Sequence, residues 1–224
     1  MNNAQFYRFI IIGILSMLVP MLIMSIWYNV RKYKVVISAI ILTVFGVVST
    51  YTWFWIETGR WLGRSFFGAV FIIPIAVILV SKLLRIPYLD LMDLCAPAEC
   101  VMLILMKVKC IIDDCCVGRV LFVSSNGAEV VFPSQIAELV NALILSVVLL
   151  ILSKNPKRRG TIYVWYLLLY GITRFILNWF RAESEPFALG LTAGCFWSLC
   201  SIVIAVSIFA FIKRKKLSNM QKVN

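Results

Sequence analysis

Long runs of apolar residues alternate with short polar segments along the chain. A helix that crosses the hydrocarbon core of a bilayer needs about 20 predominantly apolar residues. Seven runs reach or approach this length and predict transmembrane helices at 6–27, 35–56, 66–84, 95–112, 135–152, 163–180 and 187–212. The fourth is interrupted by Pro97 near its start and by Lys107 and Lys109 near its end. The pattern predicts an all-α polytopic membrane protein, with a single transmembrane domain over 1–224.

Composition and charge agree with this prediction. Of the 224 residues, 62% are hydrophobic and 14% are charged, which excludes a soluble domain and a disordered chain. The net charge of +12 by itself would suit nucleic acid. However, most lysines and arginines fall in four segments: the loops after the first, third and fifth predicted helices, and a tail at 213–224. Because basic loops stay in the cytoplasm, we expect the N-terminus outside, the C-terminus inside, and no nucleic-acid partner.

The connection at 113–133 is the long one among short loops. Its composition is polar and rich in turn-forming residues, which a membrane helix would not carry. Two β-prone runs, at 120–123 and 129–132, flank the sequence Ser-Ser-Asn-Gly and predict a small hairpin. The topology places this loop on the outer face, and loops of this length tend to be functional.

Arg174 lies in the middle of the apolar run 163–180. A cation at the centre of a membrane helix costs roughly 2.5 to 3.5 kcal/mol on insertion scales, so it usually faces a cavity, a charged partner or an anionic ligand. At about 3.6 residues per turn, Tyr170, Arg174, Asn178 and Arg181 share one stripe of the predicted helix. This stripe predicts a polar cavity. Alternatively, Arg174 forms a structural ion pair with Glu99 or Glu138, and Arg181 snorkels to the interface.

The chain has seven cysteines and no histidine. No pair has the C-x-x-C spacing of zinc ligands, so the sequence predicts neither a metal nor a cofactor. Cys110, Cys115 and Cys116 could form a disulfide in an oxidising compartment, although packing is the simpler interpretation. Without histidine, proton transfer falls to other groups. Glu99 and Glu138 are the candidate carboxylates inside apolar runs.

Five short motifs keep the order of a known family. They are Gly-Arg-Ser-Phe-Phe-Gly at 63–68, Cys-Cys-Val-Gly-Arg at 115–119, Phe-Pro-Ser-Gln-Ile-Ala-Glu at 132–138, Tyr-Gly-Ile-Thr-Arg-Phe at 170–175, and Gly-Cys-Phe-Trp-Ser at 194–198. Over roughly 60–210 the chain therefore resembles the prolipoprotein diacylglyceryl transferase family. The resemblance implies a bacterial plasma (inner) membrane enzyme. It would transfer diacylglyceryl from phosphatidylglycerol to the lipobox cysteine thiol of a prolipoprotein signal peptide, releasing glycerol phosphate.

The resemblance also implies roles for individual residues. Arg119 and Arg174 match the two arginines that hold the phosphate, and Tyr170 matches the motif tyrosine. Glu138 or Glu99 would position an arginine or take the thiol proton. The residues expected to bind substrate are Arg119, Arg174, Ser65, Gln135, Asn178 and Arg181.

The chain departs from the family pattern in the run expected after Arg119, which is not recognisable, and at three single motif positions. Phe67 stands where the family has histidine, Asn178 where it has glutamate, and Cys195 where it has glutamine. A second hypothesis is therefore a non-catalytic phospholipid-binding or accessory membrane protein of the same family. A third is a small anion transporter with Arg174 at the bilayer midplane, although no inverted repeat is detectable.

Overall fold

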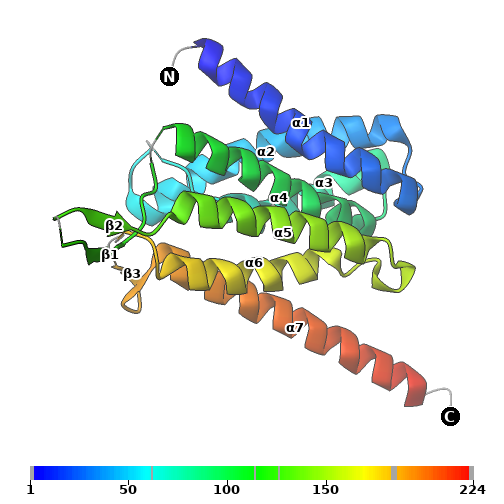
Figure 1. Ribbon diagram of the computed structural model, residues 1–224. Helices are drawn as coiled ribbons and strands as arrows, with labels where there is room; N and C mark the ends of the chain where they lie inside the picture. Colours follow the sequence, from blue (N-terminus) through cyan, green and yellow to red (C-terminus); the bar gives the residue numbers. More distant parts are fainter. Residues whose placement is uncertain (1–2, 62, 114, 126, 183–185, 222–224) are drawn as a thin grey trace.

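The computed structural model describes residues 3–61, 63–113, 115–125, 127–182 and 186–221, and this part of the chain is mainly helical (Figure 1). Five of its helices are long and apolar enough to cross a membrane, and α6 is a shorter apolar helix, as expected for a multi-pass membrane protein. The seven α-helices of this part are α1 Asn3–Tyr28, α2 Lys32–Thr58, α3 Phe67–Leu84, α4 Tyr88–Ile112, α5 Ser134–Ser153, α6 Ile162–Asn178 and α7 Ala193–Gln221.

Two predicted helix starts were wrong. The helix expected at 187–212 begins at Ala193, because the preceding residues form a short hairpin of β3 (Pro186–Ala188) and β4 (Leu191–Thr192). Leu189 and Gly190 turn the chain there with φ of 54° and 73°, a conformation that ends a helical run. At the other predicted boundary, α4 begins seven residues before the expected position 95, directly after Pro87. The basic tail continues α7 as far as Gln221.

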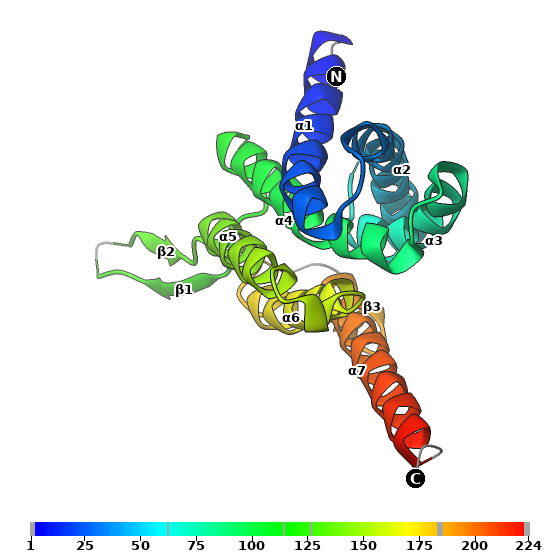
Figure 2. The same ribbon diagram turned by 90° about the vertical axis from the view of Figure 1, so that its right-hand side faces the viewer.

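The hairpin predicted between the fourth and fifth helices is present. Strand β1 (Val120–Val123) pairs antiparallel with β2 (Glu129–Val131), and Val123 faces Glu129 across the turn. The hairpin lies at one end of the helical body (Figure 1) and projects sideways from it (Figure 2).

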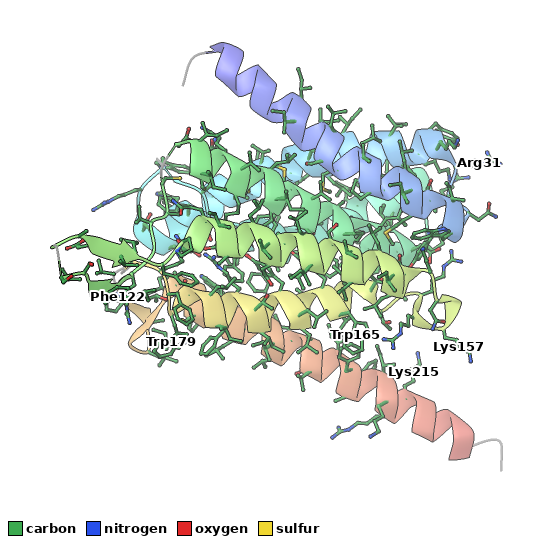
Figure 3. The ribbon with its side chains drawn as sticks, in the orientation of Figure 1. Arg31, Phe122, Lys157, Trp165, Trp179 and Lys215 are labelled. Carbon is green, nitrogen blue, oxygen red and sulfur yellow. The ribbon has the colours of Figure 1, made fainter. Side chains whose placement is uncertain are left out.

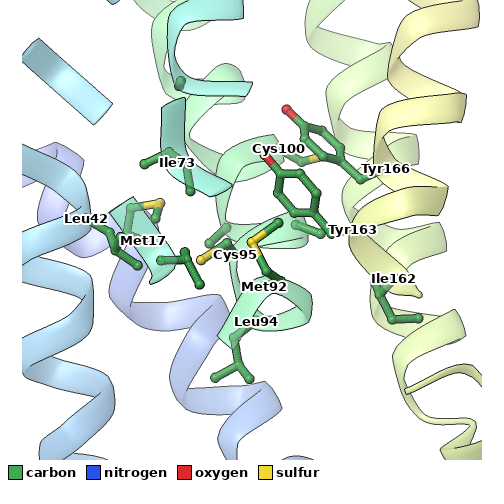
Figure 4. Close-up of a cluster of buried hydrophobic side chains, with 14 of the residues drawn as sticks. Met17, Leu42, Ile73, Met92, Leu94, Cys95, Cys100, Ile162, Tyr163 and Tyr166 are labelled. Atoms are coloured by element: carbon green, nitrogen blue, oxygen red, sulfur yellow. The ribbon is translucent and has the colours of Figure 1, made fainter. Parts of the chain in front are cut away.

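Helix α4 lies at the centre of the fold and packs against α1, α3, α5 and α6, while α6 also packs against α7. Figure 4 shows the core where Met17, Leu42 and Ile73 approach α4 from three helices. Tyr163 and Tyr166 approach it from α6. The outward faces of α1, α2, α3, α5 and α7 expose many large aliphatic side chains, as expected for helices surrounded by lipid.

The basic segments gather at one end of the molecule. Arg31, Lys157 and Lys215 lie there, whereas Phe122 and Trp179 lie at the opposite end (Figure 3). The loop between α3 and α4 joins the basic end, because the Lys34 ammonium donates to the carbonyl of Leu84 at 2.6 Å. This gathering fits one membrane face, and its cytoplasmic placement stays a prediction.

Asp93 of α4 joins three parts of the fold near the basic end. Its buried carboxylate accepts a hydrogen bond from the Tyr28 hydroxyl at 2.9 Å. It also accepts from the backbone N–H groups of Gly160, Ile162 and Tyr163. The first turn of a helix leaves such N–H groups without intrahelical partners, so Asp93 caps α6 from another helix.

We expect Asp93→Ala to lower the free energy of unfolding by about 2 to 4 kcal/mol, because it leaves the Tyr28 hydroxyl and several backbone N–H groups without an acceptor. Thermal or denaturant unfolding of the full chain in detergent measures this change. Asp113→Ala is the matched control: its exposed pair with Lys109 contributes at most about 1 kcal/mol. Equal effects of the two substitutions would contradict the capping role.

Candidate active site

Glu138 is the centre of a buried charged cluster at the end of the molecule that carries the β1–β2 hairpin. Its side chain is 4% exposed, and three cations contact it. Oε2 lies 2.6 Å from Lys107 Nζ and 2.5 Å from Arg174 Nη1. Oε1 accepts a hydrogen bond from Arg181 Nη1 at 3.0 Å. One carboxylate therefore joins α4, α5, α6 and the segment after α6.

The cluster carries an excess of positive charge. Three cations face one carboxylate, and Lys107 and Arg174 are only 8% and 15% exposed. The buried Nε of Arg174 has no hydrogen-bond partner among the described residues. Since buried charges are normally both paired and hydrogen-bonded, the cluster has unused donors and net charge for an anion. A guanidinium fork binds phosphate, like carboxylate, through two parallel hydrogen bonds.

Arg119 is brought to this end by backbone pairing. Its N–H donates to the carbonyl of Phe180 at 2.9 Å, and its carbonyl accepts from the N–H of Phe132 at 2.9 Å. The neighbouring Gly118 forms an isolated bridge with Arg181. A Cβ at Gly118 would lie 1.9 Å from the Phe132 carbonyl oxygen, so this approach requires glycine. The loop after α4 is thus fixed between the end of α6 and the end of the hairpin.

A cavity of about 130 Å³ opens beside the cluster. Arg119, Asn178 and Arg181 line it, together with Gly190, strand β4 and Cys195. Arg181 belongs both to this cavity and to the Glu138 cluster.

Of the residues expected on one stripe of the sixth helix, Asn178 is the last of α6 and Arg181 follows it. Arg181 is 25% exposed and bonds Glu138, so the snorkelling alternative was wrong.

Two of the departures from the family pattern contact each other. The amide of Asn178 donates to the Thr192 hydroxyl at 2.5 Å and lies 3.2 Å from Cys195 Sγ. A Cβ at Gly194 would lie 2.4 Å from Asn178 Oδ1. The start of α7 therefore packs closely on Asn178, in an arrangement that excludes a larger residue at 194.

The third departure, Phe67, lies in an aromatic group. Its ring is stacked 6.0 Å from that of Phe71 and lies 5.7 Å from that of Tyr170. Phe66 and Tyr166 also pack against Tyr170. The predicted motif tyrosine is therefore buried in an apolar wall one turn before Arg174.

Other predicted residues lie in separate contacts. The Ser65 hydroxyl donates to Glu57 at 2.8 Å, and Glu57 in turn interacts with the charge of Arg174. Gln135 donates through Nε2 to the carbonyl of Cys115 at 2.9 Å. Glu99 accepts a hydrogen bond from the Tyr163 hydroxyl at 3.1 Å. Of the two glutamates considered as partners of Arg174, the structure selects Glu138.

Lys107 was missed as a site residue. The sequence showed it as a charge near the end of an apolar run, the same signal that singled out Arg174. The predicted fourth helix treats it only as an interruption. A cation in a membrane helix has few alternatives to a buried partner, so the nearby Glu138 could have been paired with it.

The cysteines of the loop after α4 also lie near these cations. A hydrogen bond with the Cys110 thiol is the main cause that lowers the pKa of Cys116 to about 5. The positive charges of Arg181 and Lys107 act in the same direction. The sulfurs of Cys110 and Cys116 are 3.9 Å apart. These thiols thus share the electropositive environment of the cluster.

The fold and this site define a multi-pass membrane protein with a buried cationic cluster at one end. The chain belongs to the prolipoprotein diacylglyceryl transferase family, whose model matches residues 4–211. This family is one of transferases, as the resemblance predicted.

Several bacterial phosphatidylglycerol–prolipoprotein diacylglyceryl transferases are similar to the chain. Identity to the Clostridium tetani protein is 26% over 167 residues, which cover 69% of this chain and 67% of the relative. For Geobacter sulfurreducens it is 28% over 168 residues, covering 69% and 64%. For Helicobacter hepaticus it is 33% over 102 residues, covering 44% and 35%. The matches therefore span about one third to two thirds of these relatives.

We expect Glu138→Gln to lower the free energy of unfolding by about 3 to 5 kcal/mol, because it leaves buried cations without their carboxylate. Adding Lys107→Met to this variant removes one of those cations and restores part of the loss. The free energies of unfolding of the wild type, of the two single variants and of the double variant give the coupling energy between Glu138 and Lys107. Glu129→Gln, on exposed β2, is the matched control. Additive effects of the two substitutions would contradict a shared cluster.

Proposed function

We propose that the protein transfers the diacylglyceryl group of phosphatidylglycerol to the cysteine thiol of a prolipoprotein signal peptide, in a bacterial plasma membrane. Membership of the family and the names of the similar proteins support this substrate pair. The observation that carries the proposal is the cationic cluster around Glu138, with its unsatisfied Arg174 donor.

The chemistry makes use of this excess charge. A bond forms between the thiol sulfur and the terminal carbon of the diacylglyceryl group, and the bond from that carbon to the phosphate oxygen breaks. The lipid phosphodiester carries one negative charge, and the glycerol phosphate that leaves gains another. The thiol proton passes to that phosphate or to solvent. Fixed cations aimed at charge that develops in the transition state give most of the rate enhancement in such sites.

The named residues divide between contact and positioning. Arg174 would bind the phosphate through the side of its guanidinium that faces away from Glu138. Arg119 and Arg181 would hold the head group from the adjoining cavity. Both oxygens of Glu138 are occupied by cations, so we assign it a positioning role. Tyr170 would form part of the wall next to the reacting lipid.

Topology supports access from the outer leaflet. Phe122 and Trp179 lie at the end opposite to Arg31, Lys157 and Lys215 (Figure 3). The cluster belongs to that end, because the bridge between Gly118 and Arg181 joins the segment after α6 to the base of the hairpin. If the basic end faces the cytoplasm, the N-terminus is outside and the site opens toward the leaflet where a translocated signal peptide presents its cysteine.

The departures Phe67, Asn178 and Cys195 favour one rival function, an accessory protein that binds phosphatidylglycerol without transferring it. The buried aromatic position of Phe67 supplies no proton-transfer group. In this alternative the cationic cluster binds the head group of the lipid but does not take part in transfer.

Complementation of bacteria depleted of their own diacylglyceryl transferase separates these functions. We expect the full chain to restore growth and lipid labelling of prolipoproteins, and Arg174→Ala to lower the transfer rate at least about 100-fold, as for the loss of an oxyanion donor. Arg174→Lys keeps the charge but loses the two-point fork, so we expect a similar defect. Arg31→Lys, at the far end, is the matched control.

Binding of phosphatidylglycerol by the purified chain is measured in parallel. Failure to restore transfer by a chain that is present in the membrane and binds this lipid would favour the accessory function. Full activity of Arg174→Ala would overturn the phosphate-binding role of Arg174 and would also exclude the accessory function.

A further inference from the structure

Three cysteine sulfurs converge beside the cationic cluster. Cys110 lies in the last turn of α4, and Cys115 and Cys116 lie in the loop that follows. Their Sγ atoms are all within 4.8 Å of one another, and those of Cys110 and Cys116 are 3.9 Å apart. Thiolates bound to zinc at about 2.3 Å in a tetrahedron are separated by about 3.8 Å. The observed spacing is close to what one shared ion requires.

The loop that carries Cys115 and Cys116 is fixed by hydrogen bonds to other parts of the chain. Cys116 adopts a left-handed conformation with φ of 62°, which is uncommon for a residue other than glycine. Its carbonyl accepts from the Ser134 hydroxyl at 2.5 Å, and the carbonyl of Cys115 accepts from Gln135 at 2.9 Å. The N–H of Cys115 donates back to the carbonyl of Cys110 at 3.0 Å. The backbone thus directs three side chains to one point.

We propose that Cys110, Cys115 and Cys116 bind one thiophilic d10 metal ion, Zn²⁺ or Cu⁺. Three thiolates are soft ligands that select these ions over Mg²⁺ or Ca²⁺. A trigonal set suffices for Cu⁺, and a water molecule would complete a tetrahedron around Zn²⁺. The nearby cations Lys107 and Arg181 offset the remaining negative charge of three thiolates and one ion.

A disulfide between Cys110 and Cys116 is the competing state. It uses two of the three sulfurs and gives no reason for Cys115 to approach them. Its formation also releases two protons and two electrons to an oxidant. The convergence of all three sulfurs favours the metal ion, and the disulfide is an outcome of the test below.

Such an ion would connect two helices that form the Glu138 cluster. Lys107 is three residues before Cys110 on α4, and Glu138 is four residues after Ser134, whose hydroxyl holds the cysteine loop. The ion would fix the end of α4 against the start of α5. This role is separate from the transferase function and is tested without measuring activity.

The test uses the full chain in detergent, fully reduced and freed of metal, and titrated with Zn²⁺ against a chromogenic chelator. We expect one Zn²⁺ per chain and a higher Tm with the metal. Because changes around a ligand shell alone cost about 10 to 100-fold in affinity, we expect Cys115→Ser to weaken binding about 100-fold or more. Cys115 is exposed, so this variant should fold, and Cys116→Ser provides a second measurement. Cys200→Ser, on α7, is the matched control.

Unchanged affinity in Cys115→Ser and Cys116→Ser would overturn the proposal. A reduced wild-type chain that binds neither Zn²⁺ nor Cu⁺, the latter titrated in the same way against a Cu⁺ chelator, would also overturn it. Mass spectrometry of the chain as isolated distinguishes the competing state. A Cys110–Cys116 disulfide in the isolated chain, together with no metal binding after reduction, would assign the cluster to redox chemistry instead.

Discussion

Burial of a carboxylate is the constraint around which one end of the molecule is organised. Removing an ion from water into a medium of low polarity costs several kcal/mol even after relaxation. At Glu138 this cost is offset by cations from α4, α6 and the segment after α6. The same carboxylate keeps three mutually repelling cations together. The carboxylate and the three cations therefore depend on one another for their burial. The positive charge in excess of that carboxylate is available to a ligand.

Part of this site could be predicted from the sequence. Arg174 stood out because it interrupts an apolar run, and helical periodicity placed Tyr170 on the same stripe. The candidate buried partners of Arg174 were Glu99 and Glu138, because both lie inside apolar runs, but the sequence could not choose between them. That choice depends on how α5 and α6 face one another, which is decided by tertiary packing rather than by local pattern.

The helices were predicted well where apolar runs end in charged or turn-forming residues, as at both ends of α5. Prediction failed at 187–192 because the apolar residues there pair as short strands, and hydrophobicity alone does not distinguish a strand from a helix over a few residues. The approach of Cys110, at the end of α4, to Cys115 and Cys116 in the following loop was not predicted from their spacing, since it depends on hydrogen bonds from Ser134 and Gln135 to the loop backbone.

The backbone bridge between Gly118 and Arg181 bears on how this end of the molecule tolerates sequence change. Main-chain hydrogen bonds do not depend on side-chain identity, apart from the glycine that permits the close approach. The rim of the cavity can therefore keep its shape while neighbouring residues such as Val117 and Val120 are replaced. A chain built this way can diverge at many positions around this cavity and still hold Arg119 and Arg181 at its opening.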